Sequence, residues 1–414
     1  MLPLRGPGAN GRSWHRAVPP GHSRGADHDE RTPSPGARHH DSHPRATDGK
    51  DDRGHSARGG AAHDRRLHRR SPAGRDLDDH GEDHVEHPRQ PAGRRHQRHD
   101  ATNCHTTGRH AHPRHLERDA RSPATPDPAS IEALVDAHYD GRNLRLGREG
   151  GSTPAYRQYF VTYQGDGLTI SGRINIPRGP GPFPAVVLAH GYVPIADYTN
   201  GATMLRERDY LARHGYVTLH IDYRHHAQSS DDPRLEANLR TGYVKDAINA
   251  GLALRQFNSV DPERIGIIGR SMGGGVVYGA LVARPDLFRA GVAYSPVSSD
   301  TVDNFTKWIR PDRSRSSAVR EILARLGTPE AEPAKWATTS PRTYFDRITA
   351  PILIHHGTAD AECPIQWSRE TVAALRAAGK QVTFDVYPGQ AHTFTSQWPL
   401  SIRRTEAFLD EHLR

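Results

Sequence analysis

The strongest constraint on the fold is an alternation of short apolar runs with stretches of helical periodicity between residues 155 and 414. The apolar runs are continuous and six to eight residues long, which is typical of strands buried on both faces of a sheet. They are PAVVLAHG (184–191), YVTLHIDY (216–223), RIGIIG (264–269), FRAGVAYS (288–295) and PILIHHG (351–357). The stretches between them predict helices at 201–214, 235–257, 273–284 and 364–378. The alternation predicts an α/β fold with a mostly parallel central sheet and helices on both faces.

The two ends of this region complete the predicted domain. Residues 156–163 and 168–176 flank a Gly-Asp-Gly turn and predict an opening hairpin. A strand over 381–387 and a helix over 401–413 close the chain. We therefore expect one folded domain at 155–414, preceded by a linker at 126–154.

One long insertion interrupts the alternation. Residues 297–343 mix apolar and charged side chains, which predicts two or three short amphipathic helices. The apolar residues are Phe305, Trp308, Ile309, Ile322, Leu323, Leu326 and Trp336. Open α/β sheets bind ligands outside the carboxyl ends of their strands, so this insertion is expected to form a small helical lid over the site.

Residues 1–125 have a different composition. They contain only nine large apolar residues but 18 of the 28 histidines, too little apolar surface to offset the entropy of ordering a backbone. The segment is therefore predicted to be a disordered His/Arg-rich tail. Translation in a wrong reading frame, upstream of the real start, is the favoured explanation for it, and a biological tail is the alternative. The histidines show no fixed spacing and no cysteine partners, so we expect no specific metal site and no cofactor.

The charge of the chain belongs mostly to that tail. Residues 1–125 carry 23 Lys and Arg against 17 Asp and Glu, whereas the remainder carries 33 against 31. The nearly neutral remainder argues against a nucleic-acid partner. No run is long enough for a membrane span, and the N-terminus lacks the apolar centre of a secretion signal. The expected location is the cytoplasm, with export open if the true start differs.

The most specific chemical signal is the G-R-S-M-G sequence at 269–273. It lies directly between a predicted strand and a predicted helix. So sharp a turn holds the serine in a strained conformation and presents its hydroxyl at the sheet edge. Ser271 is therefore the predicted nucleophile.

An acid and a base follow Ser271 in the chain order that this fold requires. Asp360 comes just after the strand at 351–357, and His392 comes just after the strand at 381–387. A serine hydroxyl attacks only when a base takes its proton, so we assign His392 as base and Asp360 as the orienting acid. Glu362 is the competitor for the acid.

Other candidates are assigned structural roles. The turn after the strand at 184–191 should present the backbone N–H of Tyr192 to an oxyanion, beside the N–H of Met272. His190 is expected to support this turn without transferring protons. Cys363 is expected to be a packed residue and not a nucleophile. The remaining histidines near the strand ends are also expected to be structural: His225, His226, His355 and His356.

These motifs resemble the catalytic domain of the prolyl oligopeptidase family and its esterase-like bacterial relatives, which share features with dienelactone hydrolases. The segments that carry the resemblance are LAHGY (188–192), DYRHHAQS (222–229), DPERIGIIGRSMGGG (261–275), SPRTYFDRITAPILIHHGTAD (340–360) and YPGQAHTF (387–394). The resemblance implies the α/β-hydrolase fold and a Ser271, Asp360, His392 triad. Position 271 is serine, unlike the cysteine nucleophile of dienelactone hydrolases. Peptidases of the family also carry a β-propeller, for which the preceding 150 residues are too short and lack repeats.

The sequence therefore predicts a serine hydrolase that cleaves a small ester or amide through an acyl-enzyme. An esterase is favoured. A serine peptidase acting on short peptides is the first alternative. A non-catalytic binding protein on a hydrolase scaffold is the second. The natural substrate and the oligomeric state stay open.

Overall fold

The computed structural model describes residues 125–414. The expected disordered tail lies outside these residues, apart from its last position. Within them, no helix combines the length and the apolar character needed to cross a membrane.

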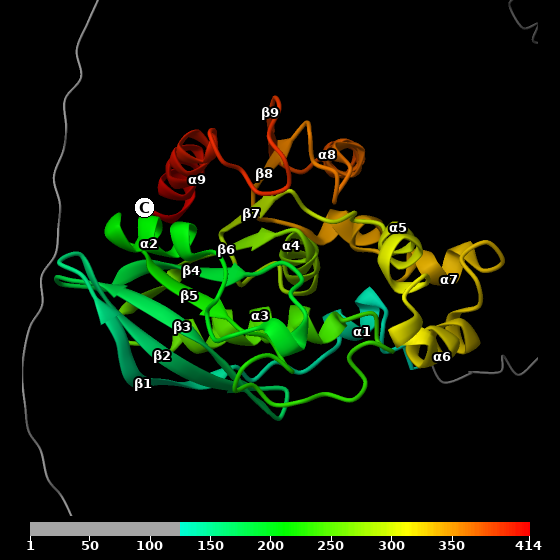
Figure 1. Ribbon diagram of the computed structural model, residues 1–414, viewed down its shortest axis with the longest axis horizontal. Coiled ribbons are helices and arrows are strands. Elements are labelled where there is room, and N and C mark those ends of the chain that lie inside the picture. The colour runs from blue at the N-terminus through cyan, green and yellow to red at the C-terminus, as the bar shows by residue number, and fades with distance from the viewer. Residues whose placement is uncertain (1–124) are drawn as a thin grey trace, which may run out of the picture. The chain divides into compact units, whose positions relative to one another are not determined.

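A nine-stranded sheet forms the centre of the domain (Figure 1). Its order is β1-β2-β3-β5-β4-β6-β7-β8-β9. The first three strands and β5 pair antiparallel, and every pair from β5 to β9 is parallel. The strands are β1 (Arg142–Ser152), β2 (Tyr156–Gly165), β3 (Leu168–Pro177), β4 (Phe183–Ala189), β5 (Val217–Ile221), β6 (Val260–Arg270), β7 (Ala290–Tyr294), β8 (Ile352–Gly357) and β9 (Val382–Tyr387). This architecture confirms the predicted α/β class and the mostly parallel sheet.

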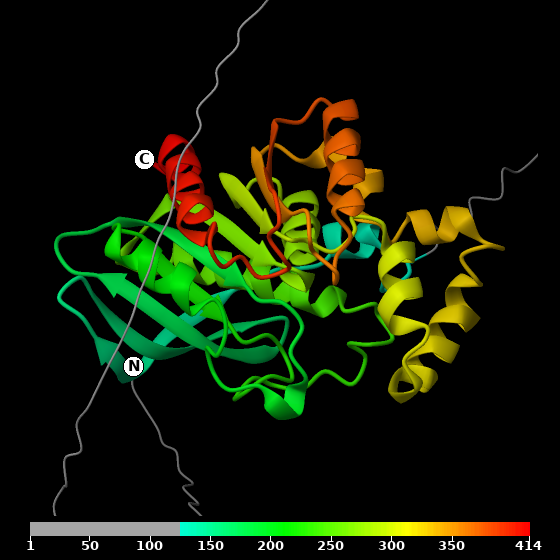
Figure 2. The same cartoon turned by 45° about the horizontal axis from the view of Figure 1, so that its top comes forward.

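Helices cover both faces of the sheet, as Figure 2 shows from a second side. α2 (Leu205–Arg213) and α9 (Trp398–Leu413) pack on one face. α3 (Thr241–Arg255), α4 (Met272–Ala283) and α8 (Ile365–Ala377) pack on the other. Alternate residues of a strand point to opposite faces. In β4, Val186 and Leu188 therefore join the core under α9, while Val187 joins the core under α3 and α4.

The insertion between β7 and β8 is helical, as expected. It contains α5 (Thr301–Asn304), the π-helix η2 (Phe305–Ile309), η3 (Arg313–Arg315), α6 (Ser316–Leu326), α7 (Pro333–Ala337) and η4 (Pro341–Arg347). Most of its apolar residues form a separate small core, centred on the fully buried Trp336. Trp308 is outside this core and packs edge-on against Trp367 of α8, with ring centroids 5.3 Å apart. We call residues 297–343 the lid.

Residues 126–154 are more structured than the predicted linker. They contain the helix α1 (Ile131–Val135) and the edge strand β1. Ser130 caps α1 by accepting a hydrogen bond from the Ala133 N–H. β1 was not predicted from the sequence, because nearly all of its side chains are exposed and no alternation of apolar and polar residues marks the strand.

The predicted helix at 235–257 is also corrected. Its helical part is α3, and residues 233–240 form turns. Leu239 and Arg240 take positive φ angles of 51° and 61°, a backbone conformation that cannot continue a right-handed helix. This turn brings Leu239 to the edge of the lid core.

Candidate active site

Ser271 occupies a strained turn between β6 and α4. Its φ is 55° and its ψ is −119°, which is rare for any residue other than glycine. The turn is possible because its neighbours lack side chains. A Cβ at Gly269 would lie 2.0 Å from the Gly273 carbonyl oxygen, and one at Gly273 would lie 1.9 Å from the Ala189 carbonyl oxygen. The predicted strand, turn and helix around Ser271 are therefore all present.

Asp360 and His392 are brought into direct contact by the loops after β8 and β9. His392 Nδ1 lies 2.8 Å from Asp360 Oδ2. The other carboxylate oxygen of Asp360 accepts the backbone N–H groups of Glu362 and Cys363, each at 2.9 Å. Burial alone would raise the pKa of Asp360. Hydrogen bonds from His356, His392 and the Cys363 N–H outweigh this effect and hold the pKa well below its usual range.

Ser271 and His392 line the same pocket. Ser271 Oγ lies 4.0 Å from Cys363 Sγ, and within residues 125–414 it makes no hydrogen bond to His392. Such contacts are often open in unliganded hydrolases and tighten with substrate. Burial raises the pKa of the Cys363 thiol to about 12, so this residue stays a thiol at neutral pH.

The turn after β4 packs directly on the serine. A Cβ at Gly191 would lie 3.2 Å from Ser271 Cβ, so the loop backbone borders the nucleophile. The N–H groups of Tyr192 and Met272 donate to no protein acceptor among the described residues. Met272 is the first residue of α4, where backbone N–H groups lack helical partners.

His190 holds this turn from beneath. Its Nδ1 lies 2.6 Å from the Gly191 carbonyl oxygen. Its ring is fully buried between Tyr198 and His220, with centroid distances of 4.8 and 5.5 Å. Burial lowers the pKa of His190 to about 4, so the ring is neutral at neutral pH.

The competing residues occupy other positions. Glu362 Oε2 lies 3.6 Å from His392 Nε2, the nitrogen opposite the one that Asp360 contacts, and its side chain is 71% exposed. His355 is buried against Tyr387 and Thr405, at 2.8 and 2.9 Å. His225 and His226 contact backbone carbonyls of their own loop region.

One contact went unforeseen in the sequence. His356, expected to be structural, is completely buried, and its Nε2 lies 3.2 Å from Asp360 Oδ2. Its Nδ1 lies 2.7 Å from the Ser368 hydroxyl. The same Nε2 donates to the Cys363 carbonyl at 2.9 Å, so His356 lies beside the carboxylate oxygen that contacts His392 and holds the loop that carries Asp360. The only sequence signal was its place four residues before Asp360, on a strand that ends at the site.

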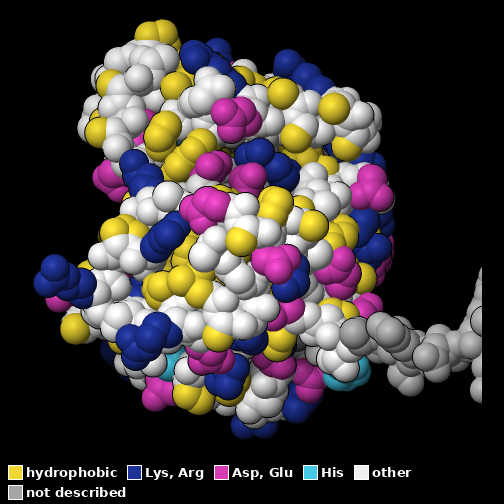
Figure 3. All heavy atoms as spheres, turned by 90° about the vertical axis from the view of Figure 1, so that its right-hand side faces the viewer, with side chains coloured by type: hydrophobic (Ala, Val, Ile, Leu, Met, Phe, Trp, Pro, Cys, Tyr) yellow, Lys and Arg dark blue, Asp and Glu magenta, His cyan; other side chains and the backbone are white. Residues whose placement is uncertain are grey.

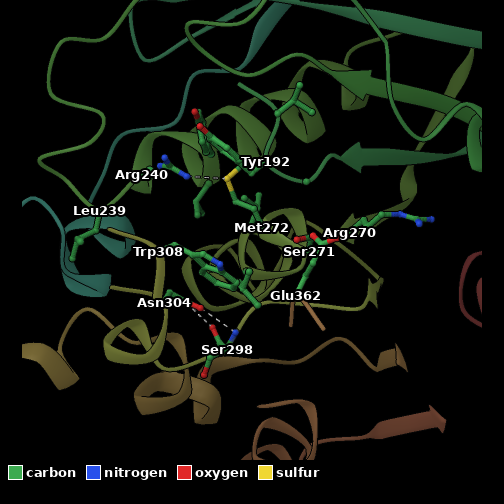
Figure 4. Close-up of a pocket in the computed structure, with 18 of the residues that line it drawn as sticks. Tyr192, Leu239, Arg240, Arg270, Ser271, Met272, Ser298, Asn304, Trp308 and Glu362 are labelled. Atoms are coloured by element: carbon green, nitrogen blue, oxygen red, sulfur yellow. Dashed lines mark hydrogen bonds between the residues drawn. The ribbon is translucent and has the colours of Figure 1, made fainter. Parts of the chain in front are cut away.

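Ser271, Met272, Tyr192 and His392 border a cavity of about 1040 Å³ beneath the lid. Figure 4 shows Ser271 and Met272 together in its wall, with Tyr192 beside them and Trp308 projecting into it from the lid. On the face that carries the lid, basic and acidic side chains are interspersed with apolar ones (Figure 3). Within residues 125–414, no three His, Cys, Asp or Glu side chains group as a metal site requires.

Comparison with known proteins agrees with this geometry. The sequence model of the prolyl oligopeptidase family matches residues 202–414, about half of the chain. The chain belongs to the prolyl oligopeptidase family. The matched region contains the strained serine turn, both loops that follow β8 and β9, and the lid. The resemblance stated from the motifs is thereby confirmed.

Esterases and peptidases both occur among the relatives of this family member. Dipeptidyl aminopeptidase BIII of Pseudoxanthomonas mexicana is 26% identical over 258 residues, covering 55% of this chain and 34% of that protein. Esterase EstD of Thermotoga maritima is 27% identical over 272 residues, covering 56% of this chain and 62% of that protein. The chain thus spans about a third of the length of the dipeptidyl aminopeptidase.

Solved structures confirm the α/β-hydrolase fold. Acetyl xylan esterase 1 from Thermoanaerobacterium superposes with a TM-score of 0.53 at 18% identity, covering 70% of this chain and 95% of that chain. The acylaminoacyl peptidase of Pyrococcus horikoshii superposes with a TM-score of 0.51 at 23% identity, covering 63% of this chain and 42% of that chain.

Proposed function

We propose that this protein is a serine hydrolase that cleaves carboxylic esters by acyl transfer to water. The observation that carries the proposal is the convergence of three strand ends at one pocket. Ser271 follows β6 there, and the hydrogen-bonded pair of His392 and Asp360 follows β9 and β8. Family membership alone is weaker support, because one relative, from Rattus norvegicus, is named inactive dipeptidyl peptidase 10.

The reaction takes two steps. Ser271 Oγ attacks the ester carbonyl while His392 Nε2 accepts its proton, and the tetrahedral oxyanion is bound by the N–H groups of Met272 and Tyr192. His392 then gives the proton to the alcohol oxygen as the bond between this oxygen and the carbonyl carbon breaks. The alcohol departs, and the acyl group stays bound to Ser271 as the acyl-enzyme. Water attacks this acyl-enzyme with the same imidazole as base. Asp360 holds Nδ1–H of His392 throughout and stabilises the imidazolium.

Esters are favoured over peptides with a free amino terminus. Recognition of an ammonium group needs carboxylates without other partners. Two of the pocket's carboxylates are already in ion pairs, Glu207 with Arg270 and Asp312 with Arg315. The remaining one, Glu362, lies against His392.

Labelling with a fluorophosphonate probe tests the proposal. We expect the probe to modify Ser271, as identified by peptide mass spectrometry, and to abolish hydrolysis of p-nitrophenyl butyrate. A panel of short peptide p-nitroanilides tests the peptidase alternative and should be cleaved more slowly than the ester. An unlabelled Ser271 would instead support the non-catalytic scaffold.

The role of His190 yields a separate prediction. The Gly191 carbonyl and the Tyr192 N–H belong to one planar trans peptide, so they point in opposite directions. By donating to that carbonyl, His190 aims the N–H at the oxyanion. We expect His190→Leu to lower kcat by about 100-fold, the usual cost of a misplaced oxyanion donor, with KM changed much less.

The amide nitrogen of asparagine can take the place of the His190 Nδ1, so His190→Asn should restore part of kcat. Steady-state kinetics and thermal melting of both variants check the assignment. If both variants lose kcat equally, in proportion to a lowered Tm, then His190 has only a structural role.

A further inference from the structure

The cavity beneath the lid has two chemically different parts. Next to His392 it is polar and charged, and we call this part the mouth. The mouth is lined by Arg206, Lys307, Glu362 and Thr393, whereas a charged group of Arg240, Asp312 and Arg315 lies around Tyr192. The other part, the apolar arm, runs from Met272 beneath the lid and is lined by Ile131, Leu134, Leu239, Val244, Val276 and Gly279.

The arm follows the surface of α4 away from the nucleophile. Gly275 and Gly279 are one helical turn apart and both line the cavity. A Cβ at Gly275 would lie 2.8 Å from a methyl group of Val297, and one at Gly279 would lie 2.8 Å from a methyl group of Val244. Glycine at these two positions therefore lets Val297 and Val244 pack closely on α4, and the arm lies along this packed surface. At a rise of 1.5 Å per residue, it extends about 12 Å from Ser271 to Gly279.

The far wall of the arm is built by a part of the chain that precedes the residues matched by the family model. Ile131 and Leu134 belong to α1, which precedes the matched residues 202–414. α1 is fixed in place at both sides. The Ile131 N–H donates to the Thr338 carbonyl at 2.8 Å, and Arg325 of the lid pairs with Asp127 at 2.9 Å.

Five of the polar side chains that border the arm already have hydrogen-bond partners, whereas the Tyr243 hydroxyl has none among the described residues. The hydroxyls of Thr241, Thr301 and Thr339 donate to backbone carbonyls at 3.1, 2.7 and 2.8 Å. The Ser298 hydroxyl donates to Asp303, and the Asn304 amide donates to the Ser298 carbonyl. A peptide in the arm would bury amide groups without partners, which is costly, whereas a hydrocarbon chain would not.

The position of His392 decides which half of an ester enters the arm. The imidazole must give its proton to the leaving alcohol, so the alcohol lies on the side of His392. His392 and Thr393 border the mouth, and the arm begins on the other side of Ser271, along α4. The acyl half is therefore directed into the arm.

We propose that the apolar arm binds an unbranched aliphatic acyl chain, and that the substrates are esters of medium-chain carboxylic acids. This inference rests on the proposed ester hydrolysis. The mouth receives the alcohol half, where charged and hydroxyl groups suit a polar alcohol. The closed end at Ile131 and Leu134 sets an upper limit to chain length, because an extended palmitoyl group exceeds the arm.

The test compares p-nitrophenyl acetate, octanoate and palmitate, which share one leaving group and differ only in acyl length. We expect kcat/KM to rise from acetate to octanoate by at least about tenfold and to fall again at palmitate. Leu239→Trp fills the arm from a partly buried loop position and should lower the octanoate-to-acetate ratio by about tenfold.

Leu400→Trp is the matched control, because Leu400 is 36% exposed on α9 and lies outside the cavity lining. It should keep the wild-type ratio. Acetate hydrolysis with no octanoate preference, or a ratio unchanged in Leu239→Trp, would overturn the acyl-chain inference and leave ester hydrolysis standing. Failure to hydrolyse any ester, with Ser271 unlabelled by the fluorophosphonate, would instead refute the proposed function.

Discussion

Replacing Ser271 with alanine is expected to lower kcat for p-nitrophenyl butyrate by about six orders of magnitude. Without the hydroxyl there is no atom to form the acyl-enzyme, and only the oxyanion donors and substrate binding remain to speed direct attack by water. Initial rates at high enzyme concentration, with active-site titration of the wild type, measure the loss. The fluorophosphonate label should disappear from the same variant.

The fold should survive this change. The Ser271 hydroxyl has the Cys363 thiol as a polar neighbour only at 4.0 Å, so alanine breaks no short hydrogen bond. The positive φ is already tolerated by a residue with a Cβ. We expect the free energy of unfolding to change by less than about 1 kcal/mol. Ser314→Ala, at an exposed serine of η3, is the matched control and should keep full activity.

A Ser271→Ala protein that is folded and still hydrolyses the ester at more than a few per cent of the wild-type rate would contradict the assignment of the nucleophile. Such a result would suggest that the Cys363 thiol, and not the Ser271 hydroxyl, is the nucleophile. The high pKa of that thiol argues against it.

The sequence was sufficient to predict the parts of the site that follow buried strands. Ser271 and Asp360 come just after the buried strands β6 and β8, His392 follows the partly buried edge strand β9, and the carboxyl ends of parallel strands meet at one edge of a sheet. The apolar runs that marked β6 and β8 are buried on both faces, so their pattern is strong. The position of each residue just after a parallel strand therefore predicted that the three side chains lie at the same edge of the sheet.

The sequence was insufficient where packing and not pattern decides the structure. β1 has almost no buried face, and instead Arg148 lies over the ring of Phe160 in β2, 3.7 Å from its centroid. α1 has only five residues, too few for a helical period, and depends on its contacts with the lid. The apolar arm depends on α1, which forms its far wall.

The contact of His356 with Asp360 is another feature that packing decides and that the sequence pattern does not reveal. Two consecutive histidines on β8 point to opposite faces of the sheet, and the sequence does not say which faces the acid. The structure directs His356 toward Asp360 and His355 toward Tyr387. Asp360 Oδ2 therefore faces two imidazoles, one in the site and one buried behind it.

This arrangement leads to the second large effect: Asp360→Asn should lower kcat by about four orders of magnitude while leaving KM within a few-fold. The backbone N–H groups of Glu362 and Cys363 require an acceptor, so they would hold the amide oxygen of the asparagine in the place of Oδ1. Its NH₂ group would then face His392 Nδ1 and His356 Nε2. His392 could meet this donor only by placing its own proton on Nε2, and in that tautomer it cannot accept the proton of Ser271.

Glu362→Gln is the matched control, since Glu362 competed with Asp360 for the role of the acid and its side chain is mostly exposed. We expect it to lower kcat by less than about tenfold, because its carboxylate lies beside Nε2 and orients no tautomer. Steady-state kinetics of both variants decide between the two carboxylates. A larger loss in Glu362→Gln than in Asp360→Asn would reverse the assignment, and the short contact between Asp360 and His392 would then have to be explained as structural.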